Sequence, residues 1–394
     1  MLKRVEIKYF RSCQNVVLDN LGRVIVLAGR NAAGKTNILR AIEWLASVAT
    51  SAALPKGGVE SGNVLLDVLI GDSIYHYSLK VELRQSPSRE GPLAALTEEL
   101  SVEGVDGALT AIFGRKNEEV NLSQTESKIG IGMAAPCMPA LLSLLPADVP
   151  ILASIRPFIS FLARIRYYPL LDSPNLDKYP ISKAEYDEWL ARYNSTGDPG
   201  EEVSPRLVHA FLTNTAQLDE LRSLLGPNGL GLLDEILIHE AAVPTKSEDH
   251  KEQTEKWYWF YFQPSLQAVR GRRFLIPFEN LSAGTRRVFR ILVSLIFDQA
   301  TVMLLEHPED GIHRGLLGKL IDVLQTYSIQ SQLIISSHSS VVFNMLHPGS
   351  VRLVTSWEGN TRVRPLTPDE LTLAGRFLEE DGAFSDFLES VSED

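Results

Sequence analysis

The chain has 394 residues, of which 44% are hydrophobic and 22% charged, as in an ordinary globular protein with two or three structural units. Its formal net charge of −11 means that the surface as a whole repels nucleic acid, so any DNA contact requires a local basic patch. Cys13 and Cys137 lack metal-ligand spacing and argue against a disulfide framework. No apolar run approaches the roughly 20 residues of a membrane span, and the N-terminus has no signal-peptide core, so we expect a soluble, cytoplasmic protein without a membrane partner.

The N-terminal segment has the pattern of a small β-layer. Residues 2–8 alternate polar and apolar side chains, and two further strands, 14–21 and 24–29, follow the segment Phe10–Ser12. The third strand is a short apolar run, which indicates a buried position. This layer therefore leads directly into the segment that begins at Gly29.

A phosphate loop follows the third strand. The pattern Gly29-x-x-x-x-Gly34-Lys35-Thr36 precedes a segment, 37–49, with the apolar spacing of an amphipathic helix. The glycines let backbone N–H groups turn around an anion, and the helix N-terminus presents its free N–H groups to the same phosphates. Lys35 is expected to reach the β- and γ-phosphates, and the Thr36 hydroxyl to hold Mg²⁺. A Gly-rich turn before an ordinary helix is the alternative, but the flanking strand and helix favour nucleotide binding.

The middle of the chain changes pattern. A β-hairpin is predicted over 62–84, and the first lobe, 1–95, is expected to end after it. The segment 96–265 begins with two short strands and ends with a second hairpin, 234–265. Helical periodicity between them is predicted over three ranges: 139–165, 179–193 and 204–225. No heptad repeat is sustained, so this insertion is predicted to be a compact helical and β subdomain and not a coiled-coil arm.

The last part of the chain, 266–394, has the pattern of a second lobe with a parallel sheet. Apolar runs at 301–305 and 332–338 are continuous and do not alternate, and a helical segment, 315–327, lies between them. A final hairpin, 351–366, precedes an acidic helix. We therefore expect an α/β fold with a mostly parallel sheet, an N-terminal antiparallel β layer and the inserted subdomain.

Three further short motifs accompany the phosphate loop. The segment LSAG, at 281–284, begins a helix, the strand at 301–305 is followed by EHPE, and the next strand ends in SSH with His338. Taken alone, Ser282 could cap a helix and His338 could end a strand. Their order along the chain resembles that of the ATPase heads of the ABC and SMC superfamily and, within it, the RecF-like and OLD-like AAA-type ATP-binding proteins of bacterial repair and anti-phage defence.

The resemblance implies an ABC-type, RecA-like ATPase head that uses ATP and Mg²⁺. Ala32 stands where many relatives have glycine, a change that leaves the bare pattern satisfied. The residues implied to form the Walker A loop are Gly29, Arg30, Asn31, Ala32, Ala33, Gly34, Lys35, Thr36 and Asn37.

The resemblance also implies a homodimer. Ser282 and Gly284 would form the signature motif that caps the γ-phosphate held by the opposite protomer, so each ATP is sandwiched between Lys35 of one chain and Ser282 of the other. Residues Asp310–His313 would form the D-loop across the dimer axis. His338 would be the switch histidine that senses the γ-phosphate.

The catalytic acids depart from the family pattern. Relatives end this strand with two acids before a proline, one for the Mg²⁺ shell and one to activate the attacking water. Here the residues are Glu306-His307-Pro308-Glu309. If Pro308 sets the register, Glu306 joins Thr36 in the metal shell, and His307 replaces the general base. A neutral imidazole can accept a proton but lacks the carboxylate's charge and reach, so hydrolysis would be slow. Alternatively, Glu306 or Glu309 does this work from a shifted position.

The preferred functional hypothesis is a nucleotide-driven dimeric switch. ATP would close the dimer and reshape the insertion, 96–265, which then holds or releases a protein effector, such as a nuclease or toxin encoded nearby in an anti-phage defence system. The chain has no clustered Asp/Glu set after its ATPase motifs that would indicate a nuclease domain of its own.

Two alternatives come from other functional classes. A RecF-like or SMC-like repair ATPase would bind DNA directly, although arginines beside a signature motif suit ATP or a dimer interface equally well. A transporter ATPase subunit is less favoured, because the stretch from Thr36 to Ser282 is far longer than the helical subdomain of transporter heads. The candidate DNA patch consists of Arg270, Arg272, Arg273, Arg286, Arg287 and Arg290.

Overall fold

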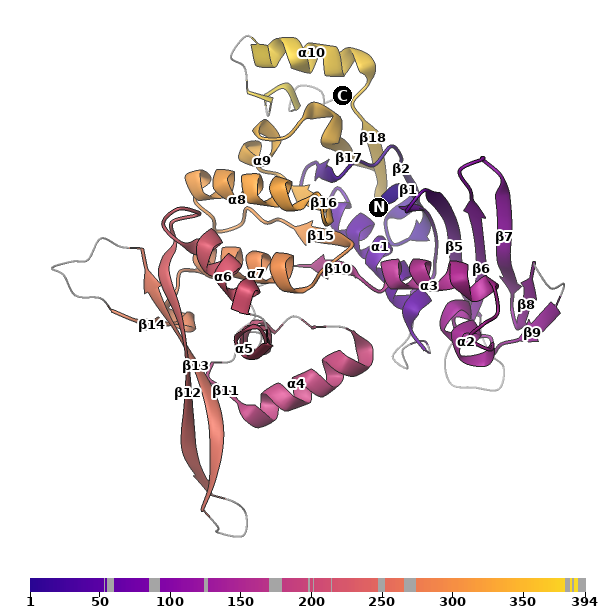
Figure 1. Cartoon of the computed structure of the whole chain (residues 1–394). Helices are drawn as coiled ribbons and strands as arrows, with labels where there is room; N and C mark the ends of the chain where they lie inside the picture. Colours follow the sequence, from indigo (N-terminus) through magenta and orange to yellow (C-terminus); the bar gives the residue numbers. More distant parts are fainter. Residues whose placement is uncertain are drawn as a thin grey trace. The chain divides into compact units, whose positions relative to one another are not determined.

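The chain forms two compact units in the computed structural model (Figure 1). Unit 1 comprises Met1–Pro169, Ala300–Pro308 and Leu324–Asp394, and unit 2 comprises Leu170–Gln299 and Glu309–Val323. The structure describes residues 1–52, 54, 60–84, 93–123, 127–169, 179–197, 199–200, 202–213, 215–246, 252–265, 274–379, 383–384 and 386–388. These units do not follow the predicted limits, since 96–169 belongs with the phosphate loop. The three predicted functional domains stay a prediction.

Unit 1 contains two sheets and the helices that pack on them. Its strands are β1 (Leu2–Phe10), β2 (Cys13–Leu18), β3 (Val24–Ala28), β4 (Gly62–Ile70), β5 (Ser73–Arg84), β6 (Leu93–Glu103), β7 (Leu109–Lys116), β8 (Glu119–Leu122), β9 (Ser127–Gly130), β10 (Ile165–Tyr168), β15 (Val302–Glu306), β16 (Gln332–Ser337), β17 (Val351–Trp357) and β18 (Asn360–Pro365). Its helical segments are α1 (Lys35–Thr50), α2 (Cys137–Leu144), α3 (Ile151–Leu162), α9 (Ser340–Asn344), η3 (Pro348–Ser350) and α10 (Pro368–Glu379).

Unit 2 combines helices with a smaller antiparallel sheet. Its elements are β11 (Ile181–Ser182), α4 (Lys183–Thr196), α5 (Val203–Thr213), α6 (Thr215–Leu225), β12 (Leu233–Lys246), β13 (Glu252–Pro264), β14 (Ile276–Pro277), η2 (Phe278–Asn280) and α7 (Ala283–Phe297). The helix α8 (Arg314–Tyr327) begins in unit 2, and its residues from Leu324 onward belong to unit 1.

The six-stranded sheet of unit 1 places the candidate site. Its order is β10-β15-β16-β3-β17-β18, and every neighbouring pair is parallel except β17 with β18. All six residues of β16 are buried, as are the first four of β15, which explains their continuous apolar runs. The carboxyl ends of β3, β15 and β16 meet at one edge, where ligands bind in open parallel sheets.

A second, eight-stranded sheet is antiparallel throughout, in the order β2-β1-β4-β5-β6-β7-β8-β9. The helix α1 contacts β1 and β4 of this sheet and also β10, β15 and β16 of the parallel sheet, so both layers share one apolar core (Figure 1). The fold is therefore α/β with mixed sheets. The predicted mostly parallel arrangement holds for the six-stranded sheet alone, and the predicted antiparallel layer extends as far as β9.

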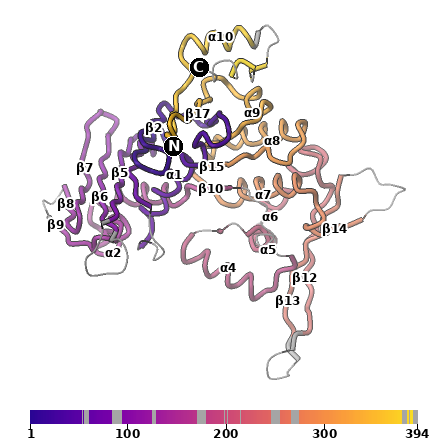
Figure 2. Tube along the Cα trace, turned by 180° about the vertical axis from the view of Figure 1, so that it is seen from behind, coloured from indigo at the N-terminus to yellow at the C-terminus, as the bar shows by residue number. Residues whose placement is uncertain are grey.

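In unit 2, the strands β12 and β13 form a long hairpin, the ribbon that runs away from the helices in Figures 1 and 2. The helix α4 contacts β13, and α6 contacts β12. One face of β13 is apolar and buried, with Tyr258, Phe260 and Phe262 at alternating positions, as the period of a strand requires. The predicted second hairpin is thus observed, with longer strands than expected.

One predicted helix is wrong at its C-terminal end. Helical periodicity was expected over 139–165, but α2 ends at Leu144, α3 ends at Leu162, and Ile165 begins β10. Pro146 and Pro150 interrupt the first helix because proline cannot donate an intrahelical hydrogen bond. The strand forms because its backbone pairs with β15, far along the chain, which local periodicity does not reveal.

Candidate nucleotide site

The phosphate loop joins β3 to α1 as the sequence predicts. The first residue of α1, Lys35, is 4% exposed, and its Nζ donates hydrogen bonds to the carbonyl oxygens of Gly29 (2.8 Å) and Arg30 (3.0 Å). Arg30, Asn31 and Ala32 are exposed. The loop therefore carries a buried cation beneath an exposed backbone, at the N-terminus of a helix. That combination suits a bound polyphosphate.

Both glycines of the loop are required by the hairpin β17–β18. A Cβ atom on Gly29 would collide with the carbonyl oxygen of Val354, and one on Gly34 would collide with the side chain of Thr361. Gly34 also has a φ of 101°, a left-handed conformation that favours glycine. The close approach of the hairpin to the loop, in addition to the turn geometry at Gly34, thus explains why both motif positions are glycine.

Ser12, in the segment Phe10–Ser12, forms hydrogen bonds beside the phosphate loop. The Ser12 hydroxyl lies 2.7 Å from that of Thr361 and accepts a hydrogen bond of 2.7 Å from the Asn37 amide. The backbone N–H of Thr361 also donates to the Ser12 carbonyl (2.8 Å). Ser12 therefore connects β18 to the first turn of α1.

Glu306 lies at the end of β15 and meets two hydroxyl groups. Thr36 donates a hydrogen bond to its Oε1, and Tyr167 donates one to its Oε2. Glu306 is paired with Ser336 of β16, so the backbone of the sheet places the carboxylate at the carboxyl edge. The structure thus brings together the two residues predicted to hold Mg²⁺, in the register set by Pro308. Their metal role stays a prediction.

Tyr167 was missed in the sequence because its segment was predicted to be near the end of a helix. Burial, followed by the hydrogen bond to Glu306 and the charge of that carboxylate, raises the pKa of Tyr167, so its hydroxyl stays protonated and acts as a donor. The Arg40 guanidinium lies over its ring, 4.9 Å from the centroid. The signal that favours a strand here is the aromatic and β-branched composition of Ile165–Tyr168.

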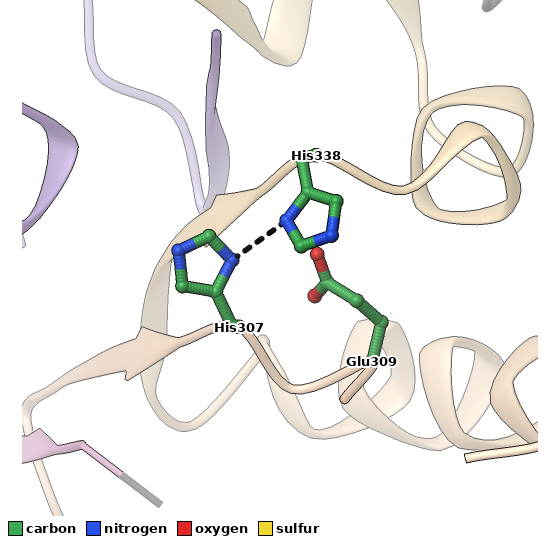
Figure 3. A group of neighbouring side chains, drawn as sticks. All are labelled: His307, Glu309 and His338. Atoms are coloured by element: carbon green, nitrogen blue, oxygen red, sulfur yellow. Dashed lines mark hydrogen bonds between the residues drawn. The ribbon is translucent and has the colours of Figure 1, made fainter. Parts of the chain in front are cut away.

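His307 and His338 contact each other at the ends of β15 and β16. Figure 3 shows the two imidazoles facing one another, with Nδ1 atoms 3.1 Å apart. One Nδ1 must carry a proton and the other must accept it, so the two tautomers are linked. The backbone of His307 is left-handed (φ 44°), and its N–H donates to the Ser336 carbonyl (3.0 Å). Glu309, also drawn, belongs to unit 2 and is buried.

In unit 2, the LSAG segment packs against the predicted D-loop. Ser282 is exposed and caps α7, since its hydroxyl accepts a hydrogen bond from the N–H of Thr285 (3.1 Å). A Cβ atom on Gly284 would collide with the Gly311 carbonyl oxygen, so glycine is needed for this close approach. The helix-cap interpretation of Ser282 is therefore observed, and its role toward a second protomer stays a prediction.

Three of the six arginines proposed as a DNA patch lie in the described residues, and none of these three is fully exposed. Arg290 is 8% exposed, and Arg286 is only partly exposed. Arg287 donates a hydrogen bond to the Asp310 carbonyl (2.7 Å). The other three, Arg270, Arg272 and Arg273, lie outside the described residues.

Comparison with a protein-family model decides the class. The model described as "AAA domain, putative AbiEii toxin, Type IV TA system" matches residues 24–91 and 176–344, more than half of the chain. The chain belongs to this family. It is an AAA-type, ATP-binding ATPase domain, and the recognition of such a head from its motifs is confirmed. No curated protein matches the chain.

This AAA domain is also similar, at 13% identity, to three solved structures of SMC heads. The SmcHead bound to the C-winged helix domain of ScpA covers 94% of this chain and 99% of its own (TM-score 0.42). The match to the SMC head domain from Thermotoga maritima covers 93% of this chain and 99% of that domain (TM-score 0.40). The third structure is the Smc head domain with an extended coiled coil, bound to the C-terminal domain of ScpA derived from Pyrococcus furiosus. The match covers 96% of this chain and 98% of that structure (TM-score 0.43).

The residues at the site fit a magnesium nucleotide. Mg²⁺ prefers hard oxygen ligands, and Thr36 and Glu306 supply a hydroxyl and a carboxylate beside the phosphate loop. Ser336, the partner of Glu306 across the sheet, is fully buried, and its hydroxyl has no hydrogen-bond partner among the described residues. Since partners in neighbouring parallel strands share a face, this hydroxyl lies on the side of the Glu306 carboxylate. No described helix is both long and apolar enough to cross a membrane.

Proposed function

We propose that this ATPase domain is a slow, dimerising MgATP switch of the ABC type that controls a partner protein. The observation that carries the proposal is the contact of Thr36 with Glu306 beside the buried Lys35. These three residues lie at the carboxyl edge of the parallel sheet, where His307 and His338 also follow the ends of their strands.

Each residue has a defined task in this proposal. Lys35 leaves its loop carbonyls to bind the β- and γ-phosphates, while the loop N–H groups hold the phosphate oxygens. Mg²⁺, when bound through Thr36 and Glu306, neutralises the charge that develops on the transferred phosphoryl group. His307 accepts the proton of the attacking water, and His338 sets its tautomer. A neutral imidazole lacks the charge and reach of a carboxylate, so turnover is slow and the ATP-bound state is long-lived.

A second copy of the chain completes the site. Ser282 is exposed at the N-terminus of α7, so it can contact a γ-phosphate held elsewhere while it caps its own helix. Gly284 and Gly311 fit together closely, which couples the signature segment to the D-loop within one protomer. ATP thus joins two protomers, each contributing one phosphate loop and one signature segment.

The partner is a protein effector in a bacterial defence or toxin–antitoxin system. The description of the family names a putative toxin of a type IV toxin–antitoxin system, and this supports a role in such a system. Direct DNA binding is less favoured, because Arg290 is buried and Arg287 is engaged by Asp310. A transporter role has no supporting observation in the described residues.

The proposal is tested by removing the cation of the phosphate loop. Lys35→Ala should weaken ATP binding about 10- to 100-fold, the equivalent of one or two charge-assisted hydrogen bonds, in isothermal titration of the full chain. Lys183→Ala is the matched control, since Lys183 is likewise the first residue of a helix but lies in α4. Equal ATP affinity of wild type and folded Lys35→Ala protein would contradict a nucleotide site at this loop.

A further inference from the structure

The Glu306 carboxylate is held from two sides. Thr36 of α1 donates to one oxygen and Tyr167 of β10 donates to the other, so neither oxygen turns without breaking a hydrogen bond. A glutamate side chain has three rotatable bonds, and its free rotation would move the oxygens away from a metal site. The strand β15 fixes only the backbone of this residue.

The register of the sheet explains why Tyr167 reaches Glu306. Tyr167 is paired with Leu304 across the parallel strands β10 and β15, and Glu306 lies two residues beyond Leu304. Residues two apart on a strand share a face, and diagonal neighbours lie within reach of a long side chain. The contact therefore follows from the fold and needs no unusual rotamer.

The helix α1 closes this arrangement into a ring. Thr36 and Arg40 are four residues apart on α1, a spacing that places both on one face of the helix. Thr36 contacts Glu306, and Arg40 lies over the ring of Tyr167. Three elements that are distant in sequence thus restrain one carboxylate, with Tyr167 between the cation and the acid.

We propose that Tyr167 is a positioning residue for the metal shell, which holds one oxygen of Glu306 so that the other stays beside Thr36. The inference rests on the proposed MgATP site and adds a residue to it. Tyr167 does not touch the nucleotide; it acts through Glu306. Its contribution should therefore appear in the dependence on Mg²⁺ and not in the affinity for the nucleotide alone. Partners of this kind are typically worth 10- to 100-fold in metal affinity.

The test compares Tyr167→Phe with wild type in ATP titrations of the full chain over a range of Mg²⁺ concentrations and in EDTA. We expect the Mg²⁺ concentration for half-maximal enhancement of ATP binding to rise about 10- to 100-fold, with unchanged affinity in EDTA. Tyr77→Phe is the matched control, because Tyr77 donates to the buried Glu98 (2.9 Å) in the antiparallel sheet. It should leave the Mg²⁺ dependence unchanged.

A double-mutant cycle separates positioning from a general structural effect. In a Glu306→Gln background, Tyr167→Phe should have no further effect on the Mg²⁺ dependence. An unchanged Mg²⁺ midpoint in Tyr167→Phe would overturn the inference. So would an equal additional rise of that midpoint when Tyr167→Phe is combined with Glu306→Gln. In both cases the proposed function stands as long as the wild type binds ATP. Absence of ATP binding by the wild type would overturn both.

Discussion

The substitution His307→Glu tests the assignment of the water-activating base. His307 follows Glu306 directly and contacts His338 through Nδ1, so a side chain at 307 reaches the space beside His338. A glutamate there would supply the carboxylate that relatives use. General-base catalysis contributes about 10²- to 10⁴-fold, or roughly 3–5 kcal/mol of barrier.

The backbone reduces the expected gain. His307 has a φ of 44°, and a left-handed conformation costs a residue with a Cβ about 1–2 kcal/mol, somewhat less for histidine than for glutamate. If about 1 kcal/mol of this cost opposes the productive geometry, roughly a factor of five in rate is lost. We therefore expect His307→Glu to raise turnover about 10- to 10³-fold.

The assay is steady-state phosphate release under saturating MgATP, with thermal melts to verify folding. His239→Glu, the same change at an exposed position of β12, should leave turnover unchanged. A wild type that already turns over briskly, together with a slower His307→Glu variant, would show that His307 is a competent base or that the base lies elsewhere. Either result refutes the slow switch.

Two further predictions concern the dimer and the phosphate loop. Ser282→Arg should leave ATP binding intact but prevent ATP-dependent dimerisation in sedimentation with a non-hydrolysable analogue, because the bulky cation occupies the place of the γ-phosphate. Ser282→Ala, which removes the hydroxyl without adding bulk or charge, separates the loss of that hydroxyl from the steric block. A normal dimer of the arginine variant would argue against the sandwich. Ala32→Gly should stabilise the protein by about 0.5 kcal/mol, since Ala32 has a φ of 62° and the relief of left-handed strain exceeds the entropy cost of glycine. Denaturant unfolding tests this sign, and destabilisation would show that the loop accommodates the Cβ without strain.

Elements with a local signal were predictable from the sequence. The phosphate loop, the helix α1, the hairpin β4–β5 and the buried strands β15 and β16 all appear where periodicity and turn residues indicate them. The glycine pattern at 29–36 also placed a loop between a strand and a helix, as observed between β3 and α1. What it did not reveal is that Val354 and Thr361 make those glycines obligatory, since they lie on a hairpin more than 300 residues later in the chain.

Features that depend on long-range pairing were not predictable. The first lobe was expected to end at residue 95, yet β6 pairs with β5 and the antiparallel sheet continues to β9. The strand β10 has only four residues, too few for a periodic signal, and it forms because β15 supplies its hydrogen bonds. Because that strand was not predicted, Tyr167 was not among the predicted site residues, although it contacts Glu306, which was.

The residues with a Cβ at positive φ include Ala32 in the phosphate loop and His307 after β15. Strain of this kind persists when the surrounding structure determines the backbone. At His307 the backbone N–H is bound to the Ser336 carbonyl of the adjacent strand, so the sheet, and not the imidazole, fixes the conformation. The side chain at 307 can therefore be exchanged without moving the backbone that carries it. For this reason His307→Glu alters the chemistry of the base, whereas Ala32→Gly alters the strain of the loop and leaves the base in place.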